Sequence, residues 1–324
     1  MNTTLLEATA RQLVAPSRGI LAADESTASA NKRFQAVGLA ETEENRRKYR
    51  TILVETPGTE TALSGVIFFD ETFRQSNDEG KSLVQSVLER GILPGIKVDE
   101  GLVDLPGFPD EKISKGLDTL PERMAAYRDA GAHFAKWRAV IVIAEQTPTD
   151  YAIRANAFVL ARYARISQDA DIVPIVEPEV LFDGTHTSER CEEVTARVYD
   201  ALFVALRDAR VHLPGIILKT GMVLPGKESG HEVDPADVAT RTARVFREHL
   251  PSELGGVVFL SGGQTPVQAF RNLNAIALQG PFPWGVTFSF SRALQDPVLR
   301  YFADHPDDRS GAEHIFARLR WFLI

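Results

Sequence analysis

Short apolar runs alternate along this chain with longer segments of helical periodicity. Six runs open on a glycine followed by branched apolar residues, and two more, 135–143 and 172–176, have the same character. Continuous apolar runs of this length are typical of strands buried on both faces, as in a parallel sheet. The opening glycines are Gly19, Gly65, Gly95, Gly215, Gly256 and Gly285. The pattern predicts eight strands.

Segments with helical spacing separate these runs, and two more follow the last one. They cover residues 30–38, 43–54, 82–89, 121–130, 151–168, 188–209, 237–249, 265–277, 296–303 and 312–322. Capping residues such as Thr42, Thr187 and Thr265 mark several starts. Repeated strand–helix units favour one (β/α)8 barrel, a TIM barrel that forms a single domain over residues 1–324. An open doubly wound sheet is the alternative, although neither GxGxxG nor GxxxxGK[ST] follows an early run.

Charged and polar residues stand in or directly after the apolar runs. A buried strand tolerates unpaired charge poorly, so these side chains need partners or a polar cavity. Catalytic residues of a (β/α)8 barrel come from the carboxyl ends of its strands, and the sequence therefore predicts an active site there. The residues concerned are Asp24, Asp70, Glu71, Lys97, Lys136, Arg138, Glu177, Glu179, Lys219, Ser261, Ser289, Ser291 and Arg292.

Three of these residues are lysines: Lys97, Lys136 and Lys219. Each alone is also explained by a lysine stem that extends from a strand end to water. Around one barrel mouth, repulsion between ammonium groups and a low-dielectric wall lower a lysine pKa and release a nucleophilic amine. Such an amine suits imine formation with a carbonyl substrate, and the pattern does not distinguish which lysine is the nucleophile.

Two glutamates, Glu177 and Glu179, flank Pro178 on one predicted strand. Side chains two residues apart on a strand point the same way, so both carboxylates face the lysines. They can act as a general acid and its electrostatic partner. Alternatively, they form a salt-bridged pair that only neutralises the lysines.

Two further segments predict phosphate binding. Ser261 and Gly262 follow the seventh run, and Ser291 and Arg292 follow the eighth, where barrels commonly bind phosphate. Glycine allows backbone N–H groups to approach an anion, and arginine offers paired donors. The polar loop 24–33 is a second anion candidate, with an ordinary capped helix start as the alternative.

Composition narrows the classes of function. The net charge of −8 argues against a nucleic-acid partner. A single cysteine, Cys191, fits a reducing compartment, and no apolar stretch reaches membrane-spanning length, so we expect a cytoplasmic protein without a membrane partner. The seven histidines form no HxH or HExxH pair, so we expect no metal and no other cofactor.

Several motifs then resemble the class I, metal-independent fructose-1,6-bisphosphate aldolases. They run in the family's order from about residue 19 to residue 295, as GILAADEST, TEENRRKYR, GIKVDEG, FAKWR, IVPIVEPE, FLSGGQ, NLNAI and FSFSRALQ. The resemblance implies a (β/α)8 barrel, typically tetrameric, without a cofactor. It also implies reversible cleavage of a phosphorylated sugar, fructose 1,6-bisphosphate, into dihydroxyacetone phosphate and glyceraldehyde 3-phosphate through a lysine Schiff base.

The same resemblance implies roles for individual residues. Lys219 is similar to the imine-forming lysine, Glu177 to the general acid/base with Glu179 beside it, and Lys136 and Asp24 to residues that assist catalysis. Arg138 matches a position that assists catalysis and binding, and Lys97 does the same. The residues expected at the C1 phosphate are Ser261, Gly262 and Arg292, and those expected at the C6 phosphate are Ser26, Ser29, Arg33 and Lys97, with Arg46 as a further anion candidate.

Three departures from the family pattern set limits on this reading. LKTGM stands where the family writes LKPNM, so Thr220 and Gly221 are expected to alter the wall beside the lysine. FSFSR replaces FSYGR, so Ser291 is expected to alter the C1-phosphate site. Family members end in a tail tyrosine that protonates the enamine, whereas the last tyrosine here is Tyr301, so either the tail is missing or the sequence is shortened. Two alternatives stay open: an aldolase for another ketose phosphate, and a sugar-phosphate-binding scaffold with little turnover.

Overall fold

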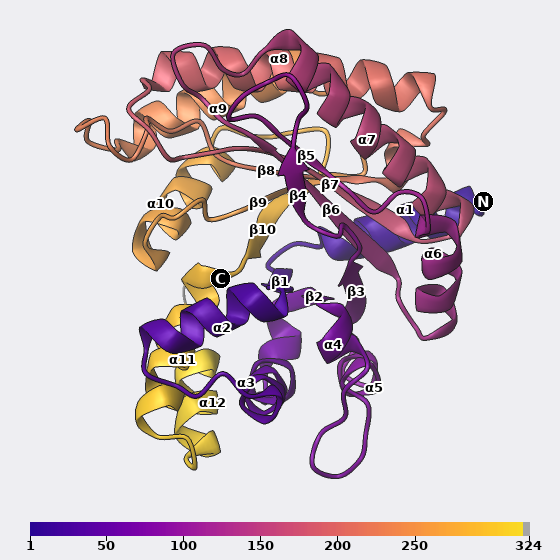
Figure 1. The fold of residues 1–324 in the computed structure, drawn as a ribbon, viewed down its shortest axis with the longest axis vertical. Coiled ribbons are helices and arrows are strands. Elements are labelled where there is room, and N and C mark those ends of the chain that lie inside the picture. The colour runs from indigo at the N-terminus through magenta and orange to yellow at the C-terminus, as the bar shows by residue number, and fades with distance from the viewer. Residues whose placement is uncertain (320–324) are drawn as a thin grey trace.

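In the computed structural model, which describes residues 1–319, eight parallel strands close into a barrel (Figure 1). The strands are β1 (Gly19–Ala23), β2 (Leu63–Phe68), β3 (Leu93–Lys97), β6 (Phe134–Ile141), β7 (Val173–Val180), β8 (Ile217–Thr220), β9 (Gly256–Phe259) and β10 (Val286–Phe290). Each strand pairs with the next of this series, and β10 pairs with β1. The predicted (β/α)8 barrel is confirmed.

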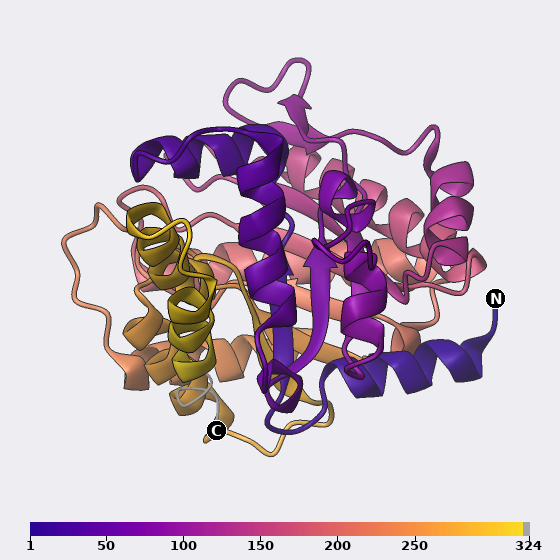
Figure 2. The same ribbon diagram turned by 90° about the horizontal axis from the view of Figure 1, so that it is seen from below.

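Helices cover the outside of the barrel. They are α1 (Thr3–Leu13), α2 (Thr27–Ala36), α3 (Glu43–Glu55), α4 (Asp70–Phe73), α5 (Leu83–Leu88), α6 (Leu120–Asp129), α7 (Asp150–Asp169), α8 (Ser188–Asp208), α9 (Pro235–His249), α10 (Pro266–Ala277), α11 (Arg292–Asp304) and α12 (Arg309–Leu319), with 3₁₀ turns η1 (Thr59–Thr61) and η2 (Leu213–Gly215). Helices α7, α8 and α9 lie on one side, and α3 lies beside α11 and α12 on the other (Figures 1 and 2). None of the described helices combines the length and apolar character needed to cross a bilayer.

The predicted helix caps are present. The hydroxyl of Thr42 accepts from the backbone N–H of Asn45, and that of Thr187 accepts from Arg190 N–H. Thr265 and Gln268 form a reciprocal capping box at the start of α10. These bonds satisfy backbone donors that have no partner inside the helix, which is why the capping residues locate helix starts well.

The N-terminal helix α1 closes the end of the barrel from which the strands start. Leu6, Ala10 and Leu13 of α1 belong to one buried cluster with side chains from inside the barrel, including Phe134. The glycines that open the strands leave room for this helix and its neighbours: a Cβ on Gly256 would lie 2.6 Å from Val14 Cγ1. Because these glycines have no side chain, α1 and its neighbours can pack closely against the strand starts at this end of the barrel.

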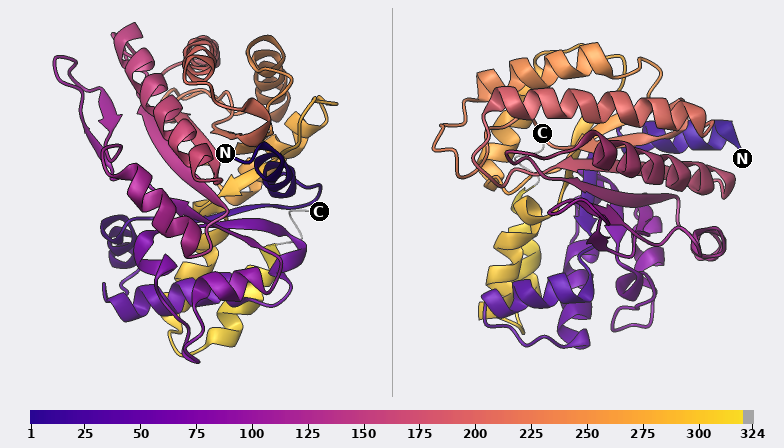
Figure 3. Two further views of the ribbon diagram at one scale, coloured as in Figure 1. Left: turned by 90° about the vertical axis from the view of Figure 1, so that its right-hand side faces the viewer. Right: turned by 45° about the horizontal axis from the view of Figure 1, so that its top comes forward.

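The structure differs from the predicted elements at the β4–β5 hairpin and at the starts of α11 and α12. The antiparallel hairpin of β4 (Leu102–Asp104) and β5 (Lys112–Ser114) was not predicted, because all three residues of β4 are exposed and show no apolar run. It projects beyond the barrel strands (Figures 2 and 3). Helix α11 begins at Arg292, earlier than predicted, and contains Pro297 in its second turn. Helix α12 also begins earlier, at Arg309, and residues 320–322 of its predicted range lie outside the described residues.

Candidate active site

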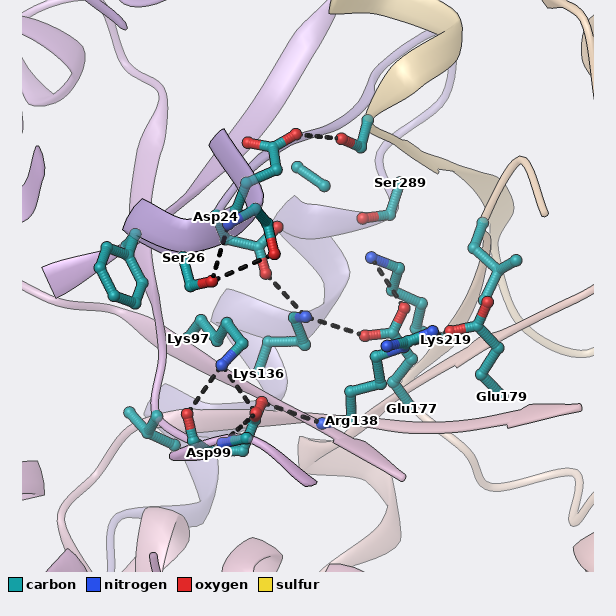
Figure 4. A pocket seen from close by; sticks show the side chains of 18 of the residues that line it. Asp24, Ser26, Lys97, Asp99, Lys136, Arg138, Glu177, Glu179, Lys219 and Ser289 are labelled. Carbon is teal, nitrogen blue, oxygen red and sulfur yellow. Dashed lines mark hydrogen bonds and ion pairs between the residues drawn. The ribbon is translucent and has the colours of Figure 1, made fainter. Parts of the chain in front are cut away.

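A polar cavity of about 980 Å³ lies at the carboxyl ends of the barrel strands. Fourteen of the fifteen predicted site residues line it, from seven different strand ends and from α2. They are Asp24, Ser26, Ser29, Arg33, Lys97, Lys136, Arg138, Glu177, Glu179, Lys219, Ser261, Gly262, Ser291 and Arg292. The fifteenth, Arg46, does not line it. Polar residues that are scattered along the sequence thus face one space (Figure 4).

Four charged side chains form a continuous chain at the centre of this cavity (Figure 4). Lys136 Nζ lies 2.7 Å from Asp24 Oδ2 and 3.1 Å from Glu177 Oε2. The other oxygen of Glu177, Oε1, lies 3.1 Å from Lys219 Nζ. The four side chains are 4–10% exposed, so each charge depends on its neighbours rather than on water.

Mutual pairing determines how these groups ionise. Burial raises the pKa of Asp24, but the Lys136 and Lys219 ammonium groups lower it more strongly, and its pKa is about 2. The same balance holds the pKa of Glu177 below its ordinary value. Burial lowers the pKa of Lys136, yet Asp24 and Glu177 raise it above its ordinary range. Of the three lysines among which the sequence left the nucleophile open, Lys136 is therefore held in its charged form, because two carboxylates flank it.

A second group of charges lies on the β3 side. Lys97 Nζ lies 2.7 Å from both Asp99 Oδ1 and the Asp99 carbonyl oxygen. Asp99 Oδ2 accepts from the backbone N–H of Arg138 at 3.3 Å, and the Arg138 guanidinium pairs with Glu179. Asp99 thus joins two predicted substrate-binding residues and was missed by the sequence analysis. Its signal was present, since it stands two residues after Lys97.

The loop between β1 and α2 forms another part of the wall. Ser26 caps α2 by accepting from the N–H of Ser29 at 3.3 Å, so the loop is a capped helix start and also lines the cavity. Arg33 pairs with Glu25 and, at 2.9 Å, with Asp296 Oδ1. These contacts keep the guanidinium at the cavity wall.

The neighbouring wall comes from the ends of β9 and β10, since β10 pairs with β1. Gly262 and Gly263 have φ of 57° and 81°, in the left-handed region that glycine adopts at little cost. The exposed Arg292 has no ion-pair partner among the described residues, and a Cβ on Gly263 would lie 3.7 Å from its Nη2. A turn of glycines and an arginine without an ion-pair partner therefore adjoin each other.

Two serines of β10 and the start of α11 behave differently. Ser291 donates its hydroxyl hydrogen to Glu25 Oε1 at 2.6 Å. Ser289 is 1% exposed and lines the cavity, and its hydroxyl has no hydrogen-bond partner within residues 1–319. The sequence analysis noted Ser289 as a polar strand end and gave it no role.

Arg46 is the predicted residue that the structure places elsewhere. Its guanidinium pairs with Glu71, with Nε–Oε1 and Nη2–Oε2 distances of 2.7 Å, and donates to Asn31. This largely buried pair uses the donors that an anion would need, because Glu71 lies in α4, the short helix after β2, and reaches α3.

Comparisons with known proteins agree with this geometry. The family described as fructose-bisphosphate aldolase class-I matches residues 5–320. The chain belongs to the class I fructose-bisphosphate aldolase family. It is 46% identical to fructose-bisphosphate aldolase 4, cytosolic, of Arabidopsis thaliana, over 98% of this chain and 81% of that protein. It is also 46% identical to fructose-bisphosphate aldolase 2, chloroplastic, of the same plant, over 94% and 76%.

A solved structure supports the same conclusion for the fold. The fructose-bisphosphate aldolase from Plasmodium falciparum, in a ternary co-crystal with TRAP and a small-molecule inhibitor, superposes with a TM-score of 0.96 at 44% identity. The match covers 98% of this chain and 92% of that one. The resemblance drawn from the motifs is therefore confirmed, and the protein is a class I aldolase, a carbon–carbon lyase.

The departures from the aldolase pattern lie in different surroundings. Thr220 turns its hydroxyl to Tyr199 OH of α8 at 2.8 Å, and neither Thr220 nor Gly221 is among the described lining residues. The Thr220 side chain therefore faces the helix layer, and the expected effect of Thr220 and Gly221 on the wall beside Lys219 stays a prediction. Within residues 1–319 of this aldolase, no group of three or more His, Cys, Asp or Glu could hold a metal ion. Residues 320–324, the C-terminal part of the sequence in which a tail tyrosine was sought, lie outside the described residues.

Proposed function

We propose that Lys219 carries the imine through which this aldolase cleaves fructose 1,6-bisphosphate into dihydroxyacetone phosphate and glyceraldehyde 3-phosphate. The observation that carries the proposal is the 3.1 Å contact between Lys219 Nζ and Glu177 Oε1 at the centre of the cavity. An ammonium group must lose a proton before it can attack a carbonyl carbon. A buried, ionised carboxylate at this distance is a suitable acceptor for that proton.

In the first half of the reaction, Glu177 takes a proton from Lys219, and the free amine attacks C2 of the ketose. As the carbinolamine forms, the nitrogen's second proton passes to the C2 oxygen, which becomes the carbinolamine hydroxyl. Glu177 then delivers its proton to the carbinolamine hydroxyl, which leaves as water and gives the protonated imine. Glu177 is again a carboxylate at the end of this half.

In the second half, a carboxylate of the Asp24–Lys136–Glu177 chain takes the proton of the C4 hydroxyl. The C3–C4 bond breaks, its electrons pass to the protonated imine to give an enamine, and the aldehyde product forms. Lys136 keeps its charge because Asp24 and Glu177 raise its pKa. Its ammonium group stabilises the negative charge that moves between these oxygens. Protonation of the enamine and hydrolysis of the imine then release dihydroxyacetone phosphate.

The two phosphates would bind to different parts of the cavity wall. The C1 phosphate is assigned to Ser261, Gly262 and Arg292, since a glycine turn and an arginine without an ion-pair partner adjoin there. Ser291 lies beside this site, and its hydroxyl is engaged with Glu25. The C6 phosphate is assigned to Ser26, Ser29, Arg33 and Lys97, with Arg138 and Glu179 between this group and Lys219.

Reductive trapping tests the nucleophile. Borohydride added with dihydroxyacetone phosphate should reduce the imine and leave a stable adduct, and peptide mapping should find it on Lys219. Lys219→Arg serves as the control, because arginine keeps a positive charge and does not form the imine. An adduct on Lys136 or Lys97, with Lys219 unmodified, would overturn the assignment.

We also propose that residues 1–324 act as one catalytic domain in a cytoplasmic homotetramer. A single, buried cysteine supports a reducing compartment, and the relatives include one named cytosolic and one named chloroplastic. Adjacent helices α7 and α8 expose Phe158 and Val204, which supports contact with other copies of the chain. Cell fractionation and the mass in solution by analytical ultracentrifugation test these two points.

A further inference from the structure

Two buried amides lie behind the Ser261–Gly263 turn, and the mechanism above uses neither. Gln264 follows the turn directly and is 8% exposed, and Asn272 stands in α10 and is 1% exposed. They belong to the motifs FLSGGQ and NLNAI, and neither of these two residues has so far received a role. A buried amide in a packed interior needs defined hydrogen-bond partners, so the contacts of these two residues show what they hold.

Gln264 holds the turn through one acceptor. The Ser261 carbonyl oxygen accepts from the Gln264 backbone N–H at 3.0 Å and from Gln264 Nε2 at 2.9 Å. A backbone bond from Leu260 N–H to the Thr220 carbonyl, 2.9 Å, fixes the start of the same segment to β8. The turn between these anchors contains the two glycines in left-handed conformation, a residue type that restricts the backbone little.

The Gln264 side-chain amide has a hydrogen-bond partner at each of its two ends. Asn272 Nδ2 donates to Gln264 Oε1 at 2.6 Å. The Ser261 carbonyl can only accept, so Gln264 must present its NH₂ group there, and its oxygen is left to accept from Asn272. Gln264 Nε2 also lies 3.7 Å from Met222 Sδ, on the segment that follows Lys219. The amide pair thus ties the turn to α10 and to the end of β8.

We propose that Gln264, oriented by Asn272, is a positioning residue for the phosphate next to the substrate carbonyl. It would hold the Ser261–Gly263 turn in the shape that accepts this phosphate, and so place the carbonyl carbon over Lys219. The inference rests on the assignment of the C1 phosphate to this turn in the proposed function. It predicts a defect that depends on the phosphate and leaves the imine chemistry of Lys219 intact.

The test replaces the donor without changing the shape of the side chain. Gln264→Glu places a carboxylate oxygen against the Ser261 carbonyl oxygen. Because a carboxylate oxygen cannot donate a hydrogen bond, the side-chain clamp, the hydrogen bond from residue 264 to Ser261, is lost. The matched control is Gln268→Glu, which adds the same charge on the exposed first turn of α10 and keeps an accepting residue in the capping box. The concentration that gives half-maximal borohydride trapping is measured with dihydroxyacetone phosphate and with unphosphorylated dihydroxyacetone.

For Gln264→Glu, the value for dihydroxyacetone phosphate should rise by about tenfold to a hundredfold, as expected for a misplaced binding group. The value for dihydroxyacetone should stay within about twofold, and Gln268→Glu should behave like the wild type with both compounds. Equal losses with both compounds would mean that Gln264 merely supports the barrel. No change with either compound would also overturn the proposal.

A second variant acts from the other end of the pair. Asn272→Asp offers an acceptor to Gln264, which draws the NH₂ group away from Ser261 and should give the same phosphate-selective loss. The double variant should be little worse than Gln264→Glu, because both changes open one clamp. Gln264→Met removes the donor without adding charge and stands in where a charged variant does not fold.

Calorimetric titration separates this inference from the proposed function. If the wild type formed no adduct, yet Gln264→Glu weakened binding of dihydroxyacetone phosphate, the imine mechanism would fail and the positioning role would stand. If trapping at Lys219 were normal and the phosphate dependence were unchanged in all variants, the imine mechanism would stand and the positioning role would fail.

Discussion

Ser291 and Glu25 join two walls of the active-site cavity through a hydrogen bond of 2.6 Å. The same carboxylate also accepts from Arg33 and, at 2.7 Å, from Arg50, so Ser291 completes a buried group that ties α11 to the β1–α2 loop. The hydroxyl at this position therefore holds the two walls together, and the cation beside it is Arg292, which has no ion-pair partner among the described residues.

Ser291→Ala should lower the free energy of unfolding by about 2 kcal/mol, because a hydrogen bond to an ionised carboxylate is lost. Urea denaturation followed by tryptophan fluorescence measures this. Ser289→Ala is the matched control, since the Ser289 hydroxyl has no partner among the described residues, and it should change stability much less. Equal losses in the two variants would contradict the structural role of the Ser291 bond.

Glu177→Gln should lower kcat by about 100- to 10,000-fold, because the amide keeps the shape of the side chain but cannot exchange a proton with Lys219 or with the carbinolamine. Steady-state kinetics with fructose 1,6-bisphosphate measures this, and the KM should change much less. A kcat within about threefold of the wild type would remove Glu177 from the acid/base role.

Arg292→Ala should raise the KM for fructose 1,6-bisphosphate by about tenfold or more, because a charge-assisted contact to phosphate is lost. Arg46→Ala provides the comparison. Its guanidinium is paired with Glu71 outside the cavity lining, so this variant should lose stability and keep a nearly normal KM. A similar rise in KM for both variants would argue that neither arginine acts by direct contact with phosphate.

Asp24 should make stability depend on pH in acid. Its pKa in the folded protein, about 2, lies below the ordinary value of 3.8, so its contribution is present above about pH 4 and is lost as the pH falls through about 2. The contribution is about 2 kcal/mol. Denaturation curves from pH 6 to pH 2 should show the wild type approaching Asp24→Asn as the pH falls, and a constant difference would contradict the low pKa.

Sequence patterns were sufficient for the strands and for most of the cavity. A buried parallel strand needs an apolar run, and a charge at its carboxyl end is conspicuous, so Asp24, Lys136 and Lys219 could be found without coordinates. The β4–β5 hairpin carries no such signal, because its β4 strand is exposed. Arg46 was predicted to bind an anion and does not line the cavity. Its presence in a motif does not reveal that its guanidinium is already paired with Glu71.

Pairing between distant residues is what the sequence does not show. The ionisation of Lys136 depends on Asp24 and Glu177, which stand on β1 and β7 and meet only when the barrel closes. A pattern read along the chain counts lysines but does not show which of them has two carboxylates beside it. The direction of the Lys136 pKa therefore followed from the geometry alone.

Helix α1 couples the folding of the early strands of the barrel to that of the late strands. Leu6 and Leu13 pack in one cluster with residues of early strands and with Ile217 and Val258 of late ones, so a chain that has assembled only half of the barrel lacks many of their partners. Partial barrels gain little from docking this helix. The first and last strands should accordingly lose their protection against amide hydrogen exchange together, as one cooperative unit.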